Sequence, residues 1–165
     1  MKLEFVAVKT EAQIDTLAKI ADEIWHEHFS AILSPEQIDY MVDVFQSYSA
    51  INEQLKKLGY SYYFLEADSN PIGYIGLKQE NNKLFLSKLY ILKEYRGKGY
   101  ASRAFEFLEE MCREKHLKAI WLTVNRNNET PIKVYEKKGF VTIREQVSDI
   151  GNGFVMDDFV MEKEI

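Results

Sequence analysis

Apolar residues recur at helical spacing through the first third of the chain, after one short strand. Residues 3–8 read as that strand, and Thr10 begins a Thr-x-x-Gln capping box, which marks a helix start. Apolar positions then return every three or four residues up to about Phe29, so this helix buries one face. A second helix is expected to follow Ser34, and a third, short helix is expected over residues 51–58.

Beyond Gly59 the apolar spacing changes to that of strands, interrupted by two further helices. A long helix is expected after Gly99 and a short one over residues 131–138, while Asn152-Gly153 predicts a hairpin turn. Strands are expected over residues 60–66, 72–78, 84–92, 119–124, 140–146 and 154–161. The fold class is therefore α/β, of the α+β kind, with a mixed sheet flanked by helices.

The chain has the length and composition of one globular domain, which we expect to cover residues 1–165. Of its 165 residues 46% are hydrophobic, enough to bury a core without disulfides or metals. No apolar run approaches the roughly 20 residues of a membrane span, and none of signal-peptide length precedes Thr10. We therefore expect a cytoplasmic protein with no membrane partner. Cys112 is the one cysteine, which argues against a disulfide and against a metal site.

The charge balance bears on possible partners. The chain has 26 acidic and 21 basic residues, a formal net charge of −5. Nonspecific nucleic-acid binding usually shows as a basic excess on one face, so nucleic acid is not an expected partner. An acidic protein suits cationic partners better, although moderate acidity also serves solubility alone.

One segment between a strand and a helix has the chemistry of an anion site. Gly97 and Gly99 let the backbone turn tightly, and the first N–H groups of the following helix carry partial positive charge. Four cations surround this place in a chain that is acidic overall. They are Lys93, Arg96, Lys98 and Arg103. A plain connector with solvated cations is the alternative reading. The spacings of a P-loop and of a Rossmann fingerprint are both absent.

This segment resembles motif A of the GNAT superfamily of N-acetyltransferases, written Arg-x-x-Gly-x-Ala. The resemblance implies that its loop holds the pyrophosphate of coenzyme A and that the preceding strand pairs with the pantetheine arm. It also implies a sheet of about seven strands, mostly antiparallel, with a bulge that splays strands four and five into a V. The implied cofactor residues are Leu89, Tyr90, Ile91, Arg96, Gly97, Lys98, Gly99, Tyr100, Ala101 and Ser102.

A second segment resembles motif B of the same superfamily. Asn128, six further residues, Tyr135 and then Gly139-Phe140 make up that pattern, with Pro131 where the family often has Ala. The resemblance implies that Asn128 contacts the cofactor and that Tyr135 stands near its sulfur. Both motifs in this order, with a strand between them, are strongly specific. They imply acetyl-CoA as co-substrate, with no metal.

The implied reaction is direct attack of a neutral amine on the acetyl thioester. A phenol near the sulfur can donate a proton to the leaving thiolate, which is the catalytic role expected of Tyr135. The base that takes the proton of the amine stays open, because Ser87 and Lys88 stand where many relatives place a glutamate. Its candidates are a water chain or one of His26, His28, Glu66 and Glu80.

The acceptor is expected to be an amine, and the whole chain resembles bacterial polyamine acetyltransferases. In this superfamily specificity usually comes from the first helices and the last strands. The expected substrate-binding residues are Trp25, His26, Tyr40, Met41 and Asp157, with Met156 and Asp158 beside them. Acetylation of a protein N-terminus or lysine and a catalytically silent acetyl-CoA binding module are the alternatives. The oligomeric state is expected to be a monomer or homodimer.

Overall fold

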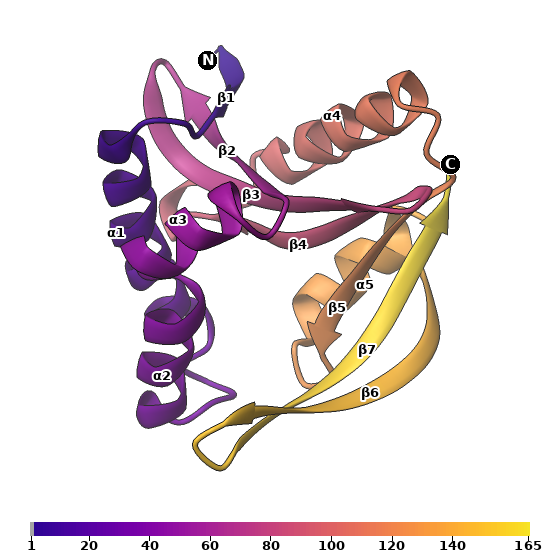
Figure 1. The fold of residues 1–165 in the computed structure, drawn as a ribbon. Coiled ribbons are helices and arrows are strands. Elements are labelled where there is room, and N and C mark those ends of the chain that lie inside the picture. Colours follow the sequence, from indigo (N-terminus) through magenta and orange to yellow (C-terminus); the bar gives the residue numbers. More distant parts are fainter. Residues whose placement is uncertain (1) are drawn as a thin grey trace.

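A computed structural model describes residues 2–165 and places one seven-stranded sheet between two groups of helices (Figure 1). The helices are α1 (Glu11–His28), α2 (Pro35–Phe45), α3 (Tyr48–Lys56), α4 (Tyr100–Glu114) and α5 (Glu129–Lys137), with a short 3₁₀ turn at Lys93–Tyr95. The strands are β1 (Leu3–Ala7), β2 (Tyr60–Ala67), β3 (Asn70–Glu80), β4 (Lys83–Ile91), β5 (Ala119–Asn125), β6 (Val141–Gly151) and β7 (Phe154–Glu164). The mixed sheet expected from the sequence is confirmed.

The sheet divides between β4 and β5. Its strand order is β1-β2-β3-β4-β5-β7-β6, and every neighbouring pair is antiparallel except β4 with β5. That parallel pair is hydrogen-bonded only where Lys83, Leu84 and Phe85 face Ala119, Ile120 and Trp121. Beyond this point the two strands diverge, and Figure 1 shows the arms spreading apart from the side where the C-terminus lies. The V-shaped splay implied by the resemblance is therefore present.

A β-bulge in β4 accompanies the divergence. Leu77 pairs with Leu86 and Gly76 with Lys88, so Ser87 has no partner across the ladder. The extra residue changes which positions face each side of the sheet. Before the bulge Leu84 and Leu86 enter one core cluster, and after it Leu89 and Ile91 do so. Lys88 and Tyr90 consequently point to the opposite face.

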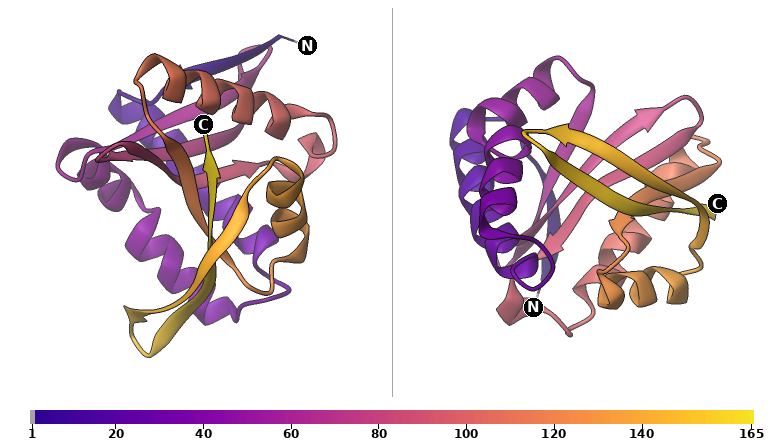
Figure 2. Two further views of the ribbon diagram at one scale, coloured as in Figure 1. Left: turned by 90° about the vertical axis from the view of Figure 1, so that its right-hand side faces the viewer. Right: turned by 90° about the horizontal axis from the view of Figure 1, so that it is seen from below.

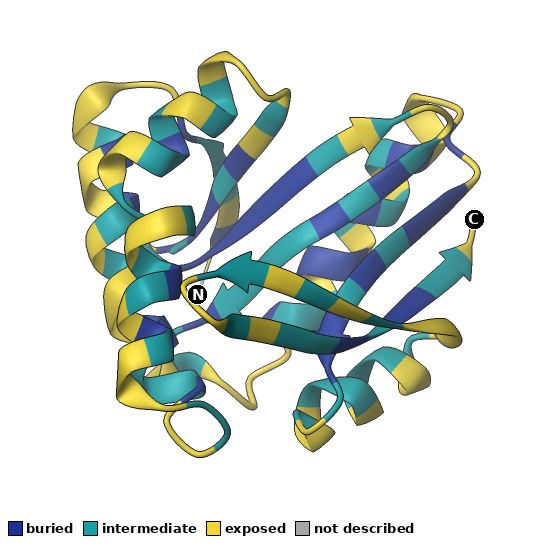
Figure 3. Cartoon of the chain, turned by 60° about the horizontal axis from the view of Figure 1, so that its bottom comes forward, coloured by how far each residue is buried: buried dark blue, intermediate teal, exposed yellow. Residues whose placement is uncertain are grey.

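Two hydrophobic clusters lie on the two faces of the sheet. One joins α4 to the inner positions of β3, β4 and β5, with Phe105, Leu108 and Ile120 almost fully buried. The other joins α1, α2 and α3 to β2 and β3 through Trp25, Phe64 and other aromatic residues. Figure 2 shows α1, α2 and α3 together on one side of the sheet. Figure 3 shows the buried residues along the strands and on the inward faces of the helices.

Several boundaries differ from the sequence-based expectation for local physical reasons. The third helix begins at Tyr48 rather than at residue 51, because the Ser47 hydroxyl accepts a hydrogen bond from Ala50 N at 3.2 Å and caps it there. The last two strands are longer than expected, since β6 stays paired with β7 up to the turn at Asn152, and β7 stays paired with β5 up to Glu164. Within residues 2–165, no helix has the length and apolar character needed to cross a bilayer.

Candidate functional site

The loop after β4 ends in exposed backbone N–H groups. Gly97 and Gly99 both have positive φ, 75° and 84°, a region that residues with a Cβ atom rarely adopt. Gly99 is the N-cap of α4, and no side chain caps this helix end. The first N–H groups of α4, from Tyr100 onward, therefore lack intrahelical partners and point out of the helix. Exposed amides and a helix dipole in this arrangement are suited to an anion.

Cationic side chains surround this helix start, as the sequence suggested. Lys98 belongs to the loop itself, and its Nζ lies 5.6 Å from the ring centroid of Tyr95. Arg103 is exposed on the first turn of α4. Lys138, at the end of α5, donates a hydrogen bond from Nζ to the Ser102 hydroxyl. Sequence reasoning missed Lys138, because it follows α5 and only the fold brings it to α4. It adds positive charge beside the exposed amides.

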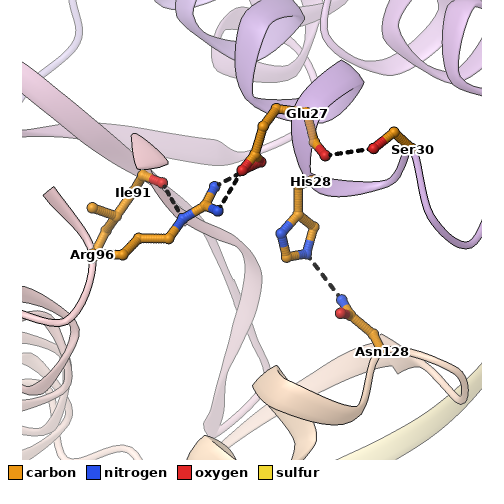
Figure 4. A network of polar contacts seen from close by, with 6 residues as sticks. All are labelled: Glu27, His28, Ser30, Ile91, Arg96 and Asn128. Atoms are coloured by element: carbon orange, nitrogen blue, oxygen red, sulfur yellow. Dashed lines mark hydrogen bonds and ion pairs between the residues drawn. The ribbon is translucent and has the colours of Figure 1, made fainter. Parts of the chain in front are cut away.

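Arg96 ties the loop to helix α1 (Figure 4). Its Nε donates to the Ile91 carbonyl at 2.9 Å, and its two terminal nitrogens donate to the Glu27 carboxylate at 2.7 and 3.2 Å. Hydrogen bonding to Arg96 lowers the pKa of Glu27 despite its partial burial. The guanidinium is thus engaged by protein groups, and Glu27 is a second residue that the sequence analysis missed.

The next residue of α1 contacts the other arm of the sheet. The Asn128 amide donates from Nδ2 to His28 Nε2 at 3.0 Å, as Figure 4 shows. This bond needs an unprotonated Nε2, and burial lowers the pKa of His28, which keeps the ring neutral. The last turn of α1 therefore joins the segment after β4, through Glu27, to the segment after β5, through His28.

Tyr135 lies on α5 between two aromatic residues of the core. Its ring is 5.9 Å from the rings of both Phe105 and Phe140, measured between centroids. Burial raises the pKa of Tyr135 to about 12, so the phenol keeps its proton at neutral pH. Burial also raises the pKa of Tyr90 on β4, and the charge of Tyr135 acts in the same direction.

The opposite face of the bulge carries a lysine among aromatic rings. Lys88 Nζ donates to the Ser87 hydroxyl at 2.9 Å and lies 5.8 Å from the ring centroid of Trp25. Burial lowers the pKa of Lys88 to about 8. Trp25 packs edge-on against Tyr90 at 5.8 Å and donates from Nε1 to the Tyr74 hydroxyl at 2.8 Å. Trp25, Lys88 and Tyr90 therefore share one place beside the strand divergence.

A buried carboxylate faces the same place from the other arm. Asp158 of β7 is 5% exposed and pairs in register with Asn125, itself 7% exposed, at the end of β5. Burial raises the pKa of Asp158 to about 6, and the neighbouring charge of Lys88 opposes that rise.

Three expected substrate-binding residues lie elsewhere. His26 lies in a surface hollow between α1 and α2, where its ring bonds to Asp39 and to the Asp22 carbonyl. Met41 is 1% exposed within the cluster formed by α1, α2 and α3. Asp157 points to the face opposite Asp158 and forms an ion pair with Arg126 at 2.8 Å.

Tyr40 and the two carboxylates considered as bases lie in different parts of the molecule. The Tyr40 hydroxyl donates to the Ile150 carbonyl at 2.7 Å, which joins α2 to the β6–β7 hairpin. Glu80 pairs with Lys83 at the turn between β3 and β4, the end of β4 remote from Ile91. Glu66 pairs with Glu4 in the register of β1 and β2, and β3 separates its strand from β4. In the part of the chain that the structure describes, no group of His, Cys, Asp and Glu side chains could hold a metal ion.

Comparisons with known proteins agree with this geometry. Residues 17–140 match the profile of the acetyltransferase (GNAT) family. A spermidine N(1)-acetyltransferase of Thermoplasma acidophilum is 29% identical over 167 residues, covering 99% of this chain and 98% of that protein. An uncharacterized N-acetyltransferase of Lactobacillus delbrueckii subsp. lactis is 26% identical over 168 residues, covering 97% and 90%.

Solved structures have the same fold. The crystal structure of a PaiA N-acetyltransferase from Thermoplasma acidophilum, in complex with coenzyme A, superposes with a TM-score of 0.81 at 27% identity and covers 100% of both chains. A GCN5-related N-acetyltransferase from Rhodopseudomonas palustris has a TM-score of 0.82 at 14% identity, covering 100% of this chain and 97% of that one. The second similarity concerns the fold alone.

The Arg96–Glu27 ion pair should stabilise the protein at neutral pH and not in acid. Because the folded state lowers the pKa of Glu27, its contribution is present above the ordinary glutamate pKa and is lost as the pH falls through the lower, folded value. Glu27→Gln should cost about 1 kcal/mol in urea unfolding near pH 7, since the pair is a third exposed, and progressively less as the pH falls below the ordinary glutamate pKa.

Glu23→Gln is the matched control, because Glu23 is an exposed residue one turn earlier on α1. It should change the free energy of unfolding little at either pH. Equal losses for the two variants at neutral pH would contradict the stabilising role of the pair.

Proposed function

Because the chain belongs to the GNAT family of acetyltransferases, we propose that it acetylates a primary amine of a small polycationic acceptor, such as a polyamine. The enzyme is an N-acetyltransferase, and acetyl-CoA is its acetyl donor. The amine attacks the thioester directly while donor and acceptor are bound together. The observation that carries this proposal is the uncapped start of α4 beside two diverging strands, with a phenol and a carboxylate on either side.

The donor diphosphate binds at the start of α4. The N–H groups of Gly97 to Ser102 supply the hydrogen bonds, and Gly97 and Gly99 leave room because nothing lies within 4 Å of a Cβ placed on either residue. Lys98, Arg103 and Lys138 supply charge. Arg96 acts by holding the loop against Glu27 and Ile91, as its contacts suggest.

The pantetheine arm lies between the diverging strands. Beyond Phe85 the edge of β4 toward β5 has no pairing partner, so backbone groups of Leu89 to Ile91 are available to the amides of the arm. This path leads from the start of α4 toward Lys88, Tyr90 and Asp158. Asn128 borders it from the other arm, where its side chain is held by His28.

Tyr135 protonates the leaving thiolate. It lies on the β5 side of the V, it retains its proton at neutral pH, and it is close to Tyr90 on the β4 side. A thiolate released in this buried setting is unstable as a charge, so proton transfer from a nearby phenol lowers the barrier to its departure.

The acceptor is a cationic amine of limited size. Trp25 and Tyr90 offer aromatic faces and Asp158 a carboxylate, which suit an ammonium group on an alkyl chain. The Gln37 side chain donates to the Val155 carbonyl at 2.9 Å, and Tyr40 bonds to Ile150, so α2 and the β6–β7 hairpin are joined over this face. That closure favours a small molecule over a peptide. The spermidine acetyltransferase of similar sequence supports the choice.

Thiol release from acetyl-CoA, measured with a panel of amines, tests the proposal. Spermidine and spermine should give a kcat/KM at least about tenfold higher than amino acids or lysine-containing peptides. A higher value for peptides would favour a protein acetyltransferase. Acetyl-CoA binding without acceleration by any amine would favour a silent binding module.

Replacement of Gly99 by Val should weaken acetyl-CoA binding about tenfold or more, because its Cβ enters the space that the diphosphate needs. Titration calorimetry measures the change. Gly153→Val is the matched control, since Gly153 also has positive φ and nothing within 4 Å of an added Cβ, but it lies in the β6–β7 turn. A similar loss of affinity in both variants would trace the effect to backbone strain and would remove the diphosphate from this loop.

Tyr135→Phe should lower kcat by roughly tenfold or more while leaving acetyl-CoA affinity nearly unchanged, because only the proton donor is removed. The measurement combines steady-state thiol release with calorimetry. Turnover equal to that of the unmodified enzyme would exclude Tyr135 as the acid.

A further inference from the structure

Asp158 is a buried carboxylate whose hydrogen bonds are incomplete. Only 5% of the residue is exposed, and its Oδ1 atom is buried with no hydrogen-bond partner within residues 2–165. Burying a carboxylate without hydrogen-bond partners costs several kcal/mol, at least as much as losing a hydrogen bond to a charged group. An unpartnered buried group of this kind calls for an explanation, and a catalytic role is one.

The position of Asp158 places it beside the strand divergence. β5 and β7 are paired along their length, and Asp158 faces Asn125, the last residue of β5. Alternation along β7 puts Asp158 on the same face as Met156, which packs with the cluster of α1, α2 and α3. Lys88 and Tyr90 reach this face from β4, because the bulge at Ser87 turns them there.

Three titratable groups interact electrostatically with the Asp158 carboxylate: Lys88, Tyr90 and Asp157. Lys88 faces it from β4, and its positive charge favours the ionised carboxylate. Tyr90, also of β4, is affected by the charge of Asp158 and by Tyr135 of α5, and burial keeps both phenols protonated. Asp157, next in the chain, disfavours ionisation, although its own carboxylate is paired with Arg126 on the other face. The facing positions of β5 and β6 are the uncharged Asn125 and Gln146.

We propose that Asp158 is the group that receives the acceptor ammonium and removes its proton before attack on the thioester. This inference rests on the proposed function, whose reaction needs such a base. None of the carboxylates and histidines that the sequence suggested as bases places an ionised carboxylate at the strand divergence. Lys88 is a cation and repels an ammonium, and His28 is engaged by Asn128.

The protons balance over the reaction. The ammonium gives one proton to the Asp158 carboxylate and becomes a neutral amine. Its nitrogen then bonds to the thioester carbon, and collapse of the adduct breaks the carbon–sulfur bond. Tyr135 gives its proton to the departing sulfur and recovers one from the nitrogen of the adduct. Asp158 finally releases its proton to solvent, so the net products are the amide, coenzyme A and one proton.

The environment of Asp158 suits a carboxylate that accepts a proton from the acceptor ammonium. Burial raises the pKa of Asp158 to about 6, close enough to neutral pH for a base to be ionised and still accept a proton. Activity that depends on the ionised form is present above this pKa and is lost as the pH falls through it. Lys88 limits the rise, so Lys88→Gln should move the acidic limb of the pH profile to higher pH.

The decisive test compares two amines of similar size in Asp158→Asn. Propylamine is protonated near neutral pH and needs a base, whereas trifluoroethylamine is mostly neutral there and does not. The variant should lower kcat/KM for propylamine by about 100-fold and for trifluoroethylamine by less than about fivefold. Acetyl-CoA affinity and thermal unfolding should be retained, because Asn has nearly the same shape. Glu164→Gln, an exposed change of equal charge on β7, should affect neither amine.

Equal losses for both amines would overturn the inference and leave a structural role for Asp158. If Asp158→Asn does not fold, the Lys88→Gln profile decides, since an acidic limb that stays in place means that another group titrates. Turnover of propylamine that is unchanged in Asp158→Asn would overturn the inference and leave the proposed function standing. Acetyl-CoA binding without turnover of any amine by the unmodified enzyme would overturn both.

Discussion

The short pairing of β4 with β5 is the constraint on which the rest of the structure depends. Three residue pairs hold the two arms of the sheet together, and beyond them the strands separate. The bulge at Ser87 occurs where this separation begins and turns Lys88 and Tyr90 to the face of α1. One arm then leads to the uncapped start of α4, and the other leads to Asp158 and α5. In the proposed function, donor and acceptor therefore approach the divergence from opposite faces of the sheet.

The end of α1 fixes how the two arms meet at this place. Glu27 bonds to Arg96 on one arm and His28 to Asn128 on the other, from adjacent positions of one helix. Both bonds depend on protonation, since Glu27 must be ionised and His28 neutral. Arg96 and Asn128 belong to the two motifs by which the sequence resembles the family. In this structure their side chains join the two arms to α1, while the main-chain amides at the start of α4 stay uncapped.

Local sequence signals predicted most of the elements, and the resemblance supplied their arrangement. The capping box at Thr10 and the turn at Asn152 are complete within a few residues, so they could be read without the fold. The bulge had a signal that went unused, because the apolar positions change phase between Leu86 and Leu89. Contacts between distant segments had no such signal. Glu27 and Lys138 became part of the site only when α1 met β4 and α5 met α4. His26 was expected at the acceptor but lies in the hollow between α1 and α2, and Met41 is buried in the cluster of α1, α2 and α3.

Main-chain amides at the start of α4 would bind a diphosphate and so direct the thioester between the separated strands. Calorimetry with coenzyme A and with pantetheine, which lacks the diphosphate together with the 3′-phosphoadenosine, measures this. Coenzyme A should bind at least about 100-fold more tightly, since several charge-assisted hydrogen bonds are involved. Equal affinities for the two compounds would contradict it.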